Sequence, residues 1–158
     1  MTIEKFLSEI ENREKHTKSK IVVGYLEEEI VKFLNNNNIE VHTKEIYINH
    51  KGLAHLSRES KRQRGAGLSR EDIIKIPKIL KNPTNIFFDS RKEKLNLLYC
   101  DKKSCEVMIK LVIDTKMIYK GEKLTLIKTA GYVKWYNIEK DRYYKEVERP
   151  SPSHTSPC

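Results

Sequence analysis

The stretch Ile46–Asp89, IYINHKGLAHLSRESKRQRGAGLSREDIIKIPKILKNPTNIFFD, organises the rest of this chain. Its two flanks are rich in apolar residues, whereas residues 58–67 contain a single apolar side chain, Ala66. This middle part has no acid after Glu59 and carries the cations Arg58, Lys61, Arg62 and Arg64. A core segment would repeat its apolar residues at a regular helical or strand period. We therefore expect these cations to project from a loop or a helix end into solvent or onto a ligand.

The segments on either side of these cations have helical patterns. The segment before them, KGLAHL, has apolar residues at helical spacing and places His55 beside the basic run. After them, Ser69 precedes Asp72 by three residues, which predicts a capped helix start. Pro77 suits the first position of a further helical turn, and Asn82–Pro83 predicts the end of that turn.

The rest of the chain places helices first and strands afterwards. Apolar residues at helical spacing predict helices over 3–15 and 25–34, and the asparagines at 35–38 predict the end of the second one. Strand-like segments follow at 39–48, 85–89, 95–100, 105–114, 123–130 and 133–144. Short loops between the later segments suit an antiparallel meander. This order predicts an α+β fold with the N-terminal helices packed on one face of a four- to five-stranded antiparallel sheet, whose other face stays open to a ligand.

Positive charge is concentrated in the central stretch and in the strands after it. The formal net charge is +9, made up of −2 over residues 1–45, +6 over 46–82 and +5 over 83–158. A basic face of this kind is expected to meet phosphate groups. No apolar run approaches the roughly 18 residues that span a bilayer, and the amino terminus is too acidic for a secretory signal. We therefore expect a soluble, cytoplasmic protein that does not bind membranes.

The cysteines Cys100, Cys105 and Cys158 have neither the CxxC spacing nor the paired histidines of a zinc site, so we predict no metal. Cys100 and Cys105 flank DKKS, a plausible hairpin loop, and would face each other across two strands. They would oxidise to a disulfide if the protein were exported. In a cytoplasmic protein we expect them to be free thiols.

Several of these segments together resemble a known nuclease superfamily. The pattern xHLxR…LSxEDIIKIPKILKNPxNIxxD, then a lysine in a central strand and IKTAGY, is similar to the phage-associated nuclease domains of the barnase/EndoU/colicin/RelE-like superfamily. Such domains occur at the ends of phage head-morphogenesis proteins and polymorphic toxins. The resemblance covers roughly residues 40–138. It implies an α+β domain that acts as a metal-independent ribonuclease without a cofactor, by general acid/base attack of the ribose 2′-hydroxyl.

The residue patterns and the resemblance together give a domain organisation, and the resemblance implies the roles of single residues. The expected units are an N-terminal helical segment at 1–38, a nuclease-like α+β domain at 39–148 and a disordered tail at 149–158. The family's first histidine corresponds to His55, its nearby basic residue to Arg58 or Lys61, and its late-strand hydroxyl to Thr129. Family members often carry a second histidine a few residues after the first, and here SRESKRQR takes that place. A lysine or arginine there stabilises charge but is a poor proton donor near neutral pH unless its pKa is strongly shifted.

The chemistry of RNA cleavage points to the same residues independently. Metal-free cleavage needs a base for the 2′ proton, an acid for the leaving oxygen and cations for the phosphorane charge. His55 is the one side chain in the basic stretch whose ordinary pKa suits the base. His42 and His50 are weaker candidates, since histidines in or near strands are more often partly buried polar residues. We therefore predict His55, Arg58, Lys110 and Thr129 as catalytic and Lys61, Arg62, Arg64, Tyr132 and Lys134 as substrate-binding residues.

Two other functions are consistent with the same sequence. The first is a non-catalytic RNA- or protein-binding module on the same scaffold, which the replaced second histidine favours. The second is a phage structural protein whose basic face touches packaged DNA. The expected partners of the ribonuclease are RNA and an acidic immunity or inhibitor protein, which a +9 surface would attract. As a toxin or effector, the chain would also be delivered into a target cell or packaged with phage.

Overall fold

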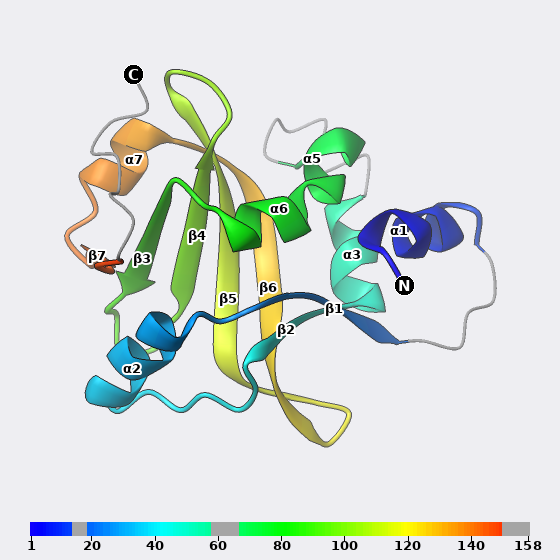
Figure 1. Ribbon diagram of the computed structural model, residues 1–158. Helices are drawn as coiled ribbons and strands as arrows, with labels where there is room; N and C mark the ends of the chain where they lie inside the picture. Colours follow the sequence, from blue (N-terminus) through cyan, green and yellow to red (C-terminus); the bar gives the residue numbers. More distant parts are fainter. Residues whose placement is uncertain (14–18, 58–66, 150–158) are drawn as a thin grey trace.

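The sheet at the centre of the molecule has seven strands in the order β1-β2-β6-β5-β4-β3-β7. It is seen in a computed structural model that describes residues 1–13, 19–57 and 67–149 (Figure 1). The strands are β1 Lys20–Tyr25, β2 Glu45–Asn49, β3 Asn85–Asp89, β4 Leu97–Lys102, β5 Val107–Tyr119, β6 Glu122–Lys134 and β7 Tyr144–Glu146. The helices are α1 Ile3–Glu11, α2 Glu28–Asn36, α3 His50–Leu56, α5 Arg70–Ile74, α6 Ile76–Lys81 and α7 Trp135–Glu139.

This architecture confirms the α+β class and corrects the predicted number of strands. Strands β3 to β6 form the expected antiparallel meander with short loops. The two additional strands are short ones at the sheet edges, β1 and β7. The predicted helical segment at 1–38 contains β1, which pairs antiparallel with β2 and is thus part of the sheet. Helices also lie between β2 and β3 and after β6, not only at the N-terminus.

Two sequence segments predicted as strands have a different structure. In the segment 39–48 only the part from Glu45 onward is a strand, which runs to Asn49. In the segment 133–144, the first two residues end β6, α7 follows, and β7 begins at the last residue. Strand β6 is therefore continuous where we expected a break between two strands. Strand β6 pairs with β5 over almost its whole length, and this pairing keeps the strand extended past Gly131, where the break was expected.

Successive side chains of the central strands point to opposite faces of the sheet. Ile109, Leu111 and Ile113 of β5 belong to the main core, which also contains buried residues of α1, α2, α3, α5 and α6. Met108 lies on the other face, in a smaller cluster with Leu98 and with Ile138 of α7. We call this the second face of the sheet. Helix α7 covers only the part of this face that lies near β3 and β4.

The helix ends follow the predicted capping chemistry. Ser69 is the N-cap of α5, and its hydroxyl accepts a hydrogen bond from the backbone N–H of Asp72 at 3.2 Å. Pro77 lies in the first turn of α6, where a missing backbone donor costs nothing. Helix α2 ends among the asparagines, with Asn37 as C-cap and Asn38 in the left-handed region at φ 60°.

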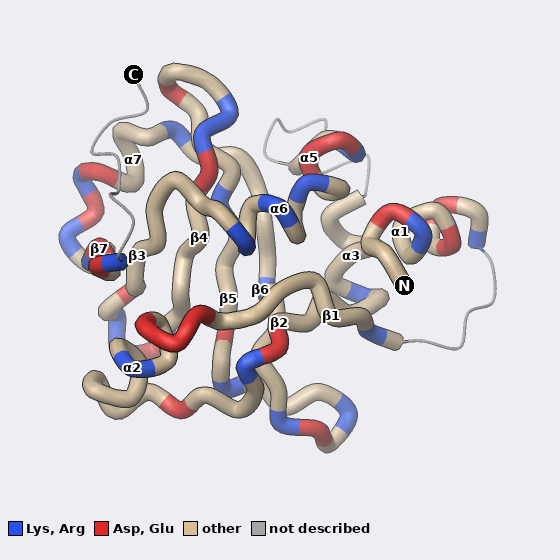
Figure 2. The backbone as a smooth tube through the Cα atoms, in the orientation of Figure 1, with Lys and Arg blue, Asp and Glu red and all other residues tan. Residues whose placement is uncertain are grey.

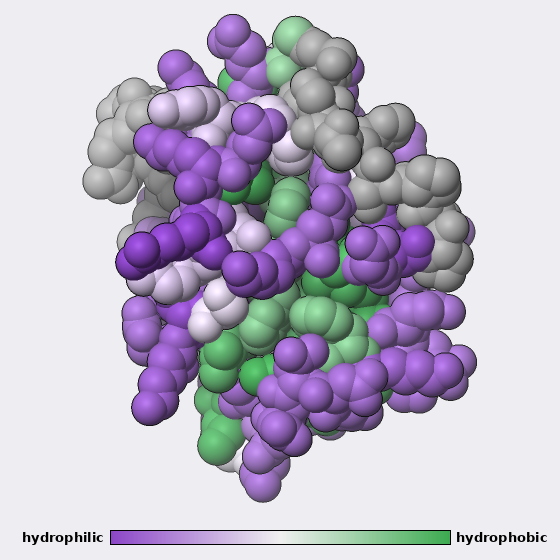
Figure 3. Space-filling view, turned by 90° about the vertical axis from the view of Figure 1, so that its left-hand side faces the viewer, coloured by the Kyte–Doolittle hydropathy of each residue, from purple (hydrophilic) through white to green (hydrophobic). Residues whose placement is uncertain are grey.

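The outer surface is mostly polar. Acidic residues gather at the start of α2, and lysines follow one another along α6 (Figure 2). On the side of the molecule shown in Figure 3, an apolar area below the centre is bordered by hydrophilic residues. Among the described helices, none is long and apolar enough to cross a bilayer.

Cys100 lies in β4 and Cys105 in the loop before β5, and they do not form the bridge that their hairpin spacing allowed. Cys100 is a free thiol, fully buried on the second face, where burial raises its pKa to about 12. Cys105 is disulfide-bonded, which corrects the expectation of a free thiol at this position. Cys158 and most of the predicted tail lie outside the described residues.

Candidate active site

Helix α3 brings His55 to the edge of β6. Strand β2 pairs with β6 in parallel only as far as Tyr47 and Leu126. Asn49 then ends β2 and caps α3, its side-chain oxygen accepting a hydrogen bond from the backbone N–H of Gly52 at 2.6 Å. The helix therefore starts where the strand pairing stops and packs against the remaining part of β6. His55 lies in the last turn of α3 and is exposed.

His55 borders a cavity of about 440 Å³ that also contains Lys110 and Thr129. Its floor includes Leu98 and Val112, the apolar side chains of the second face. The other lining residues are Asp89, Arg91, Lys94, Asn96, Lys128 and Tyr144. Three residues predicted as catalytic thus line one cavity, beside three further cations. A site of this composition suits a phosphate group above an apolar base-binding floor.

A β-bulge explains why two adjacent residues of β6 reach the same cavity. Val112 pairs with Thr129 while Ile113 pairs with Ile127, so Lys128 is an extra residue on β6. In a regular strand Lys128 and Thr129 would point to opposite faces. Here both are exposed and both line the cavity. The bulge therefore places a cation next to a hydroxyl without burying either.

Arg91 is held in place by Asp89 at the end of β3. The Nε of Arg91 donates to Oδ1 of Asp89 at 2.9 Å, and its Nη2 donates to Oδ2 at 2.5 Å. The hydrogen bonds that it donates to this carboxylate raise the pKa of Arg91 further above its ordinary value, so the guanidinium stays charged. Asp89 is buried and Arg91 is about one third exposed. A guanidinium has five N–H donors, so three remain for a ligand in the cavity.

Tyr144 begins β7, directly opposite Asp89 on β3. Its ring lies 6.5 Å from that of Phe87, and the guanidinium of Arg91 lies 5.9 Å from its centroid. Burial raises the pKa of Tyr144, with smaller contributions in the same direction from Asp141 and Asp89. The phenol therefore keeps its proton at neutral pH.

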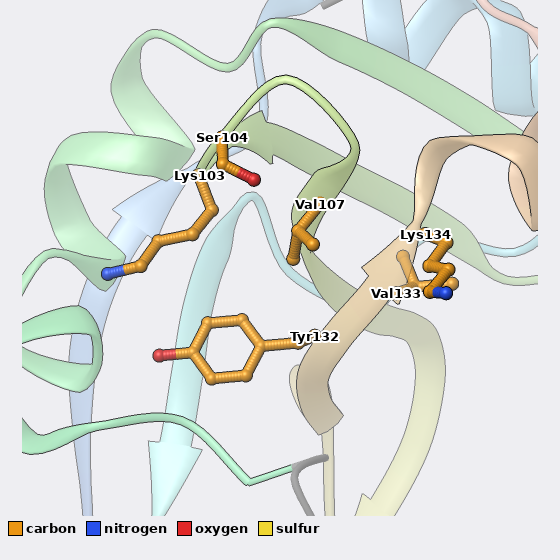
Figure 4. Close-up of a pocket in the computed structure, with 6 residues that line it drawn as sticks. All are labelled: Lys103, Ser104, Val107, Tyr132, Val133 and Lys134. Atoms are coloured by element: carbon orange, nitrogen blue, oxygen red, sulfur yellow. The ribbon is translucent and has the colours of Figure 1, made fainter.

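Tyr132 and Lys134, predicted as substrate-binding residues, line a different cavity of about 540 Å³ at the end of the β4–β5 hairpin (Figure 4). Tyr132 and Lys103 extend toward the same side, and Lys134 lies apart from them. The hydroxyl of Tyr132 donates a short hydrogen bond to Oδ2 of Asp72 and accepts one from the backbone N–H of Ser69 at 3.1 Å. Tyr132 thus joins β6 to the start of α5.

Asp72 is fully buried beneath this contact. Burial by itself raises the pKa of Asp72, but hydrogen bonds from Lys103 and Tyr132 outweigh it and hold the pKa below its ordinary value. The amino group of Lys103 lies 2.8 Å from Oδ2. Asp72 is therefore a charged, paired residue that anchors α5, and it lies away from the cavity of His55.

The other predicted residues either lie outside the described part of the chain or lie away from the cavity of His55. Arg58, Lys61, Arg62 and Arg64 lie outside the described residues. The ring of His50 packs against Phe6 with centroids 6.2 Å apart. His42 contacts the carbonyl of Met117 at 3.0 Å and Glu40 at 2.6 Å. In the described part of the chain, no group of three or more His, Cys, Asp or Glu side chains suits a metal ion.

Sequence reasoning missed Arg91, Lys94 and Lys128 as cavity residues. The SRKEK segment reads as a polar loop, and nothing in its composition shows which face of the sheet it borders. One local signal was present, because an aspartate two residues before an arginine commonly holds it at a turn. The bulge that turns Lys128 toward Thr129 has no such signal, since it depends on the register of β5 and β6.

Comparison with known proteins identifies a nuclease family. A family profile described as "phage-Barnase-EndoU-ColicinE5/D-RelE like nuclease3" matches residues 20–130, well over half of the chain. The matched range begins with β1 and ends in β6 just after Thr129. It includes His55, Arg91 and Lys110 and leaves out Tyr144. Searches of curated proteins and of solved structures found no match.

Proposed function

The chain belongs to the phage-Barnase-EndoU-ColicinE5/D-RelE like nuclease family, and from this premise we propose that it is an endoribonuclease that needs no metal ion. The reaction is the attack of a ribose 2′-hydroxyl on the adjacent phosphate. It leaves a 2′,3′-cyclic phosphate on one product and a 5′-hydroxyl on the other. General acid/base catalysis and charge stabilisation are sufficient for this transesterification.

The residues of the cavity divide into three roles. His55 takes the proton of the 2′-hydroxyl, because a neutral imidazole is a suitable general base in this reaction. Arg91 and Lys110 hold the phosphate and stabilise the charge of the phosphorane. Thr129 donates a hydrogen bond to a phosphate oxygen. Leu98 and Val112 provide apolar surface for a nucleobase.

The observation that supports this proposal most is the shared cavity of His55, Lys110 and Thr129. These residues come from a helix and two strands and are far apart in sequence, yet they border one space of about 440 Å³. Held by Asp89, the Arg91 guanidinium is fixed before any substrate binds. Charges that are oriented in advance stabilise a transition state more effectively than mobile ones.

The test is a cleavage assay on single-stranded RNA with a chelator present. We expect the unmodified protein to cut RNA and to leave intact the same oligonucleotide with 2′-deoxyribose at the cleaved position. His55→Ala should lower kcat by about 10²–10⁴-fold and leave RNA affinity nearly unchanged. His42→Gln is the matched control, since His42 lies outside the cavity. Cleavage that stops with chelator, or that survives His55→Ala, would overturn the proposal.

One observation favours a second function, a non-catalytic RNA-binding module. Among the described residues, the cavity contains one histidine, and its carboxylate, Asp89, accepts hydrogen bonds from Arg91 on both oxygens. A binding module needs the cations but no proton donor. RNA bound in a salt-dependent way and never cut by the unmodified protein would establish this second function. An acidic inhibitor protein would compete with RNA for the same basic cavity in either case.

A further inference from the structure

We infer that Tyr144 is the catalytic residue that gives a proton to the leaving 5′-oxygen of the cleaved RNA. This inference rests on the proposed function, because it assigns the second proton transfer of the same reaction. The base alone does not complete the cleavage, since the departing 5′-oxygen would otherwise leave as a strongly basic alkoxide. A proton donor in the same cavity is therefore required.

The other proton-bearing groups of the cavity are less suitable. Arg91 cannot lose a proton near neutral pH, and both oxygens of Asp89 already accept hydrogen bonds from it. Lys94, Lys110 and Lys128 bring positive charge to the phosphate, and a lysine that gave up its proton would lose this charge as the phosphorane collapses. A neutral phenol can donate without removing a cation from the site.

Tyr144 and His55 border the cavity from different sides of the sheet. The attacking 2′-oxygen and the leaving 5′-oxygen lie roughly in line on opposite sides of phosphorus. His55 reaches the cavity from α3, beside β6, and Tyr144 reaches it from β7, beyond β3. Strands β5 and β4 lie between β6 and β3 in the sheet. Base and acid therefore enter from opposite walls of one cavity.

The surroundings of Tyr144 suit both states of a proton donor. Packing against Phe87 and partial burial keep the phenol protonated before the reaction. The guanidinium of Arg91, 5.9 Å from the ring, favours the phenolate that remains after the transfer. Because Asp89 fixes Arg91, the cation stays beside the ring while the phosphate is bound.

The step balances in atoms and charge. The bond from phosphorus to the 2′-oxygen forms as the bond to the 5′-oxygen breaks. His55 takes the proton of the 2′-hydroxyl, and the hydroxyl of Tyr144 gives its proton to the 5′-oxygen. Afterwards the imidazolium loses a proton to water and the phenolate gains one, so the enzyme returns to its starting state.

The experiment compares Tyr144→Phe on two RNA substrates, one normal and one with sulfur in place of the bridging 5′-oxygen. A thiolate leaves without a proton, so the second substrate does not need the acid. We expect Tyr144→Phe to lower kcat on normal RNA by about 10²–10⁴-fold with little change in KM. On the sulfur substrate the variant should cut nearly as fast as the unmodified protein. His55→Ala should stay slow on both substrates, because the attack still needs its base.

The matched control is Tyr143→Phe, since Tyr143 neighbours Tyr144 and does not line the cavity. Thermal unfolding of both variants separates loss of structure from loss of chemistry. An equal loss on both substrates, or no loss on normal RNA, would overturn the role of Tyr144 and leave the ribonuclease proposal standing. No cleavage of either substrate by the unmodified protein would overturn both.

Discussion

Asp89 and Arg91, two residues apart in sequence, form a bidentate ion pair at the edge of the cavity. Besides the two side-chain hydrogen bonds at 2.9 and 2.5 Å, the backbone N–H of Arg91 donates to Oδ1 of Asp89 at 3.1 Å. The carboxylate is buried and the guanidinium reaches into the cavity. The turn after β3 therefore fixes a cation in a defined direction, which a flexible surface lysine does not achieve.

Arg91→Lys should reduce RNA cleavage although it keeps the charge. Lysine cannot make both hydrogen bonds to Asp89 and still present donors to a phosphate. We expect kcat/KM to fall by roughly ten- to a hundredfold, as for the loss of a charge-assisted hydrogen bond. The control is Arg142→Lys, because Arg142 is exposed and does not line the cavity. Equal activity of the two variants would contradict a role for the bidentate pair of Arg91 with Asp89.

Tyr132→Phe should cost stability. The variant loses the hydrogen bond to the buried Asp72 carboxylate and the one accepted from Ser69. A hydrogen bond to a buried charged group contributes roughly 1.5–3 kcal/mol, so the free energy of unfolding should fall by about that amount in a urea titration. Tyr136→Phe, at an exposed tyrosine, is the control. A fall in RNA affinity with unchanged stability would instead support the substrate-binding role that the sequence predicted for Tyr132.

Asp72 should make the protein sensitive to acid. Its pKa is held below the ordinary value in the folded state, so its ion pairs stabilise the fold fully above the unfolded pKa of about 3.9. This contribution is lost as the pH falls through the lowered pKa. Between about pH 5 and pH 3, Asp72→Asn should therefore lose less stability than the unmodified protein. Glu29→Gln on α2, with an exposed carboxylate, should follow the unmodified curve.

Much of the fold follows from local sequence signals, and the corrections come from tertiary pairing. The Ser69 cap, the asparagine stop after α2 and the meander of β3 to β6 depend on neighbouring residues, which a sequence displays. Strand β1 reads as a brief apolar run and becomes a strand only by pairing with β2. The segment from Trp135 folds as α7 although its aromatic residues favour strands, because Ile138 packs onto the second face.

In the candidate site, too, some residues can be chosen from the sequence and others depend on tertiary pairing. His55 and Lys110 can be selected by residue type, because RNA cleavage needs a titratable base and cations. The hydroxyl of Tyr132 can hydrogen-bond a phosphate, but the normal alternation of a strand turns this side chain to the helix side, toward Asp72. Arg91 and Tyr144 reach the cavity through the pairing of β3 with β7, which no sequence pattern reveals.

Gly24→Ala should destabilise the protein at the edge of the sheet. A Cβ at this position would lie 2.9 Å from Cδ1 and 3.0 Å from Cβ of Leu80, which is buried on α6. The helix would have to move away from β1, at a cost of about 1–3 kcal/mol for overpacking. Thermal unfolding measures this change. Leu80→Ala in the same chain should recover part of the loss from Gly24→Ala, because it removes Cδ1, the nearest clashing atom, although Cβ stays. An additive result would rule out the contact as the cause.

Lys110→Ala and Lys128→Ala should each weaken the salt dependence of RNA binding. Both lysines line the cavity, from β5 and from the bulge of β6, and lysines lie along both strands in Figure 2. A cation that neutralises one phosphate of a single strand contributes about 0.7 to the slope of log affinity against log salt concentration. We therefore expect the slope to become less steep by about that amount in each variant. Lys32→Ala on α2 makes the same change of charge at an exposed position away from the cavity and should keep the slope. Equal slopes for all three variants would show that RNA binds elsewhere on the basic surface.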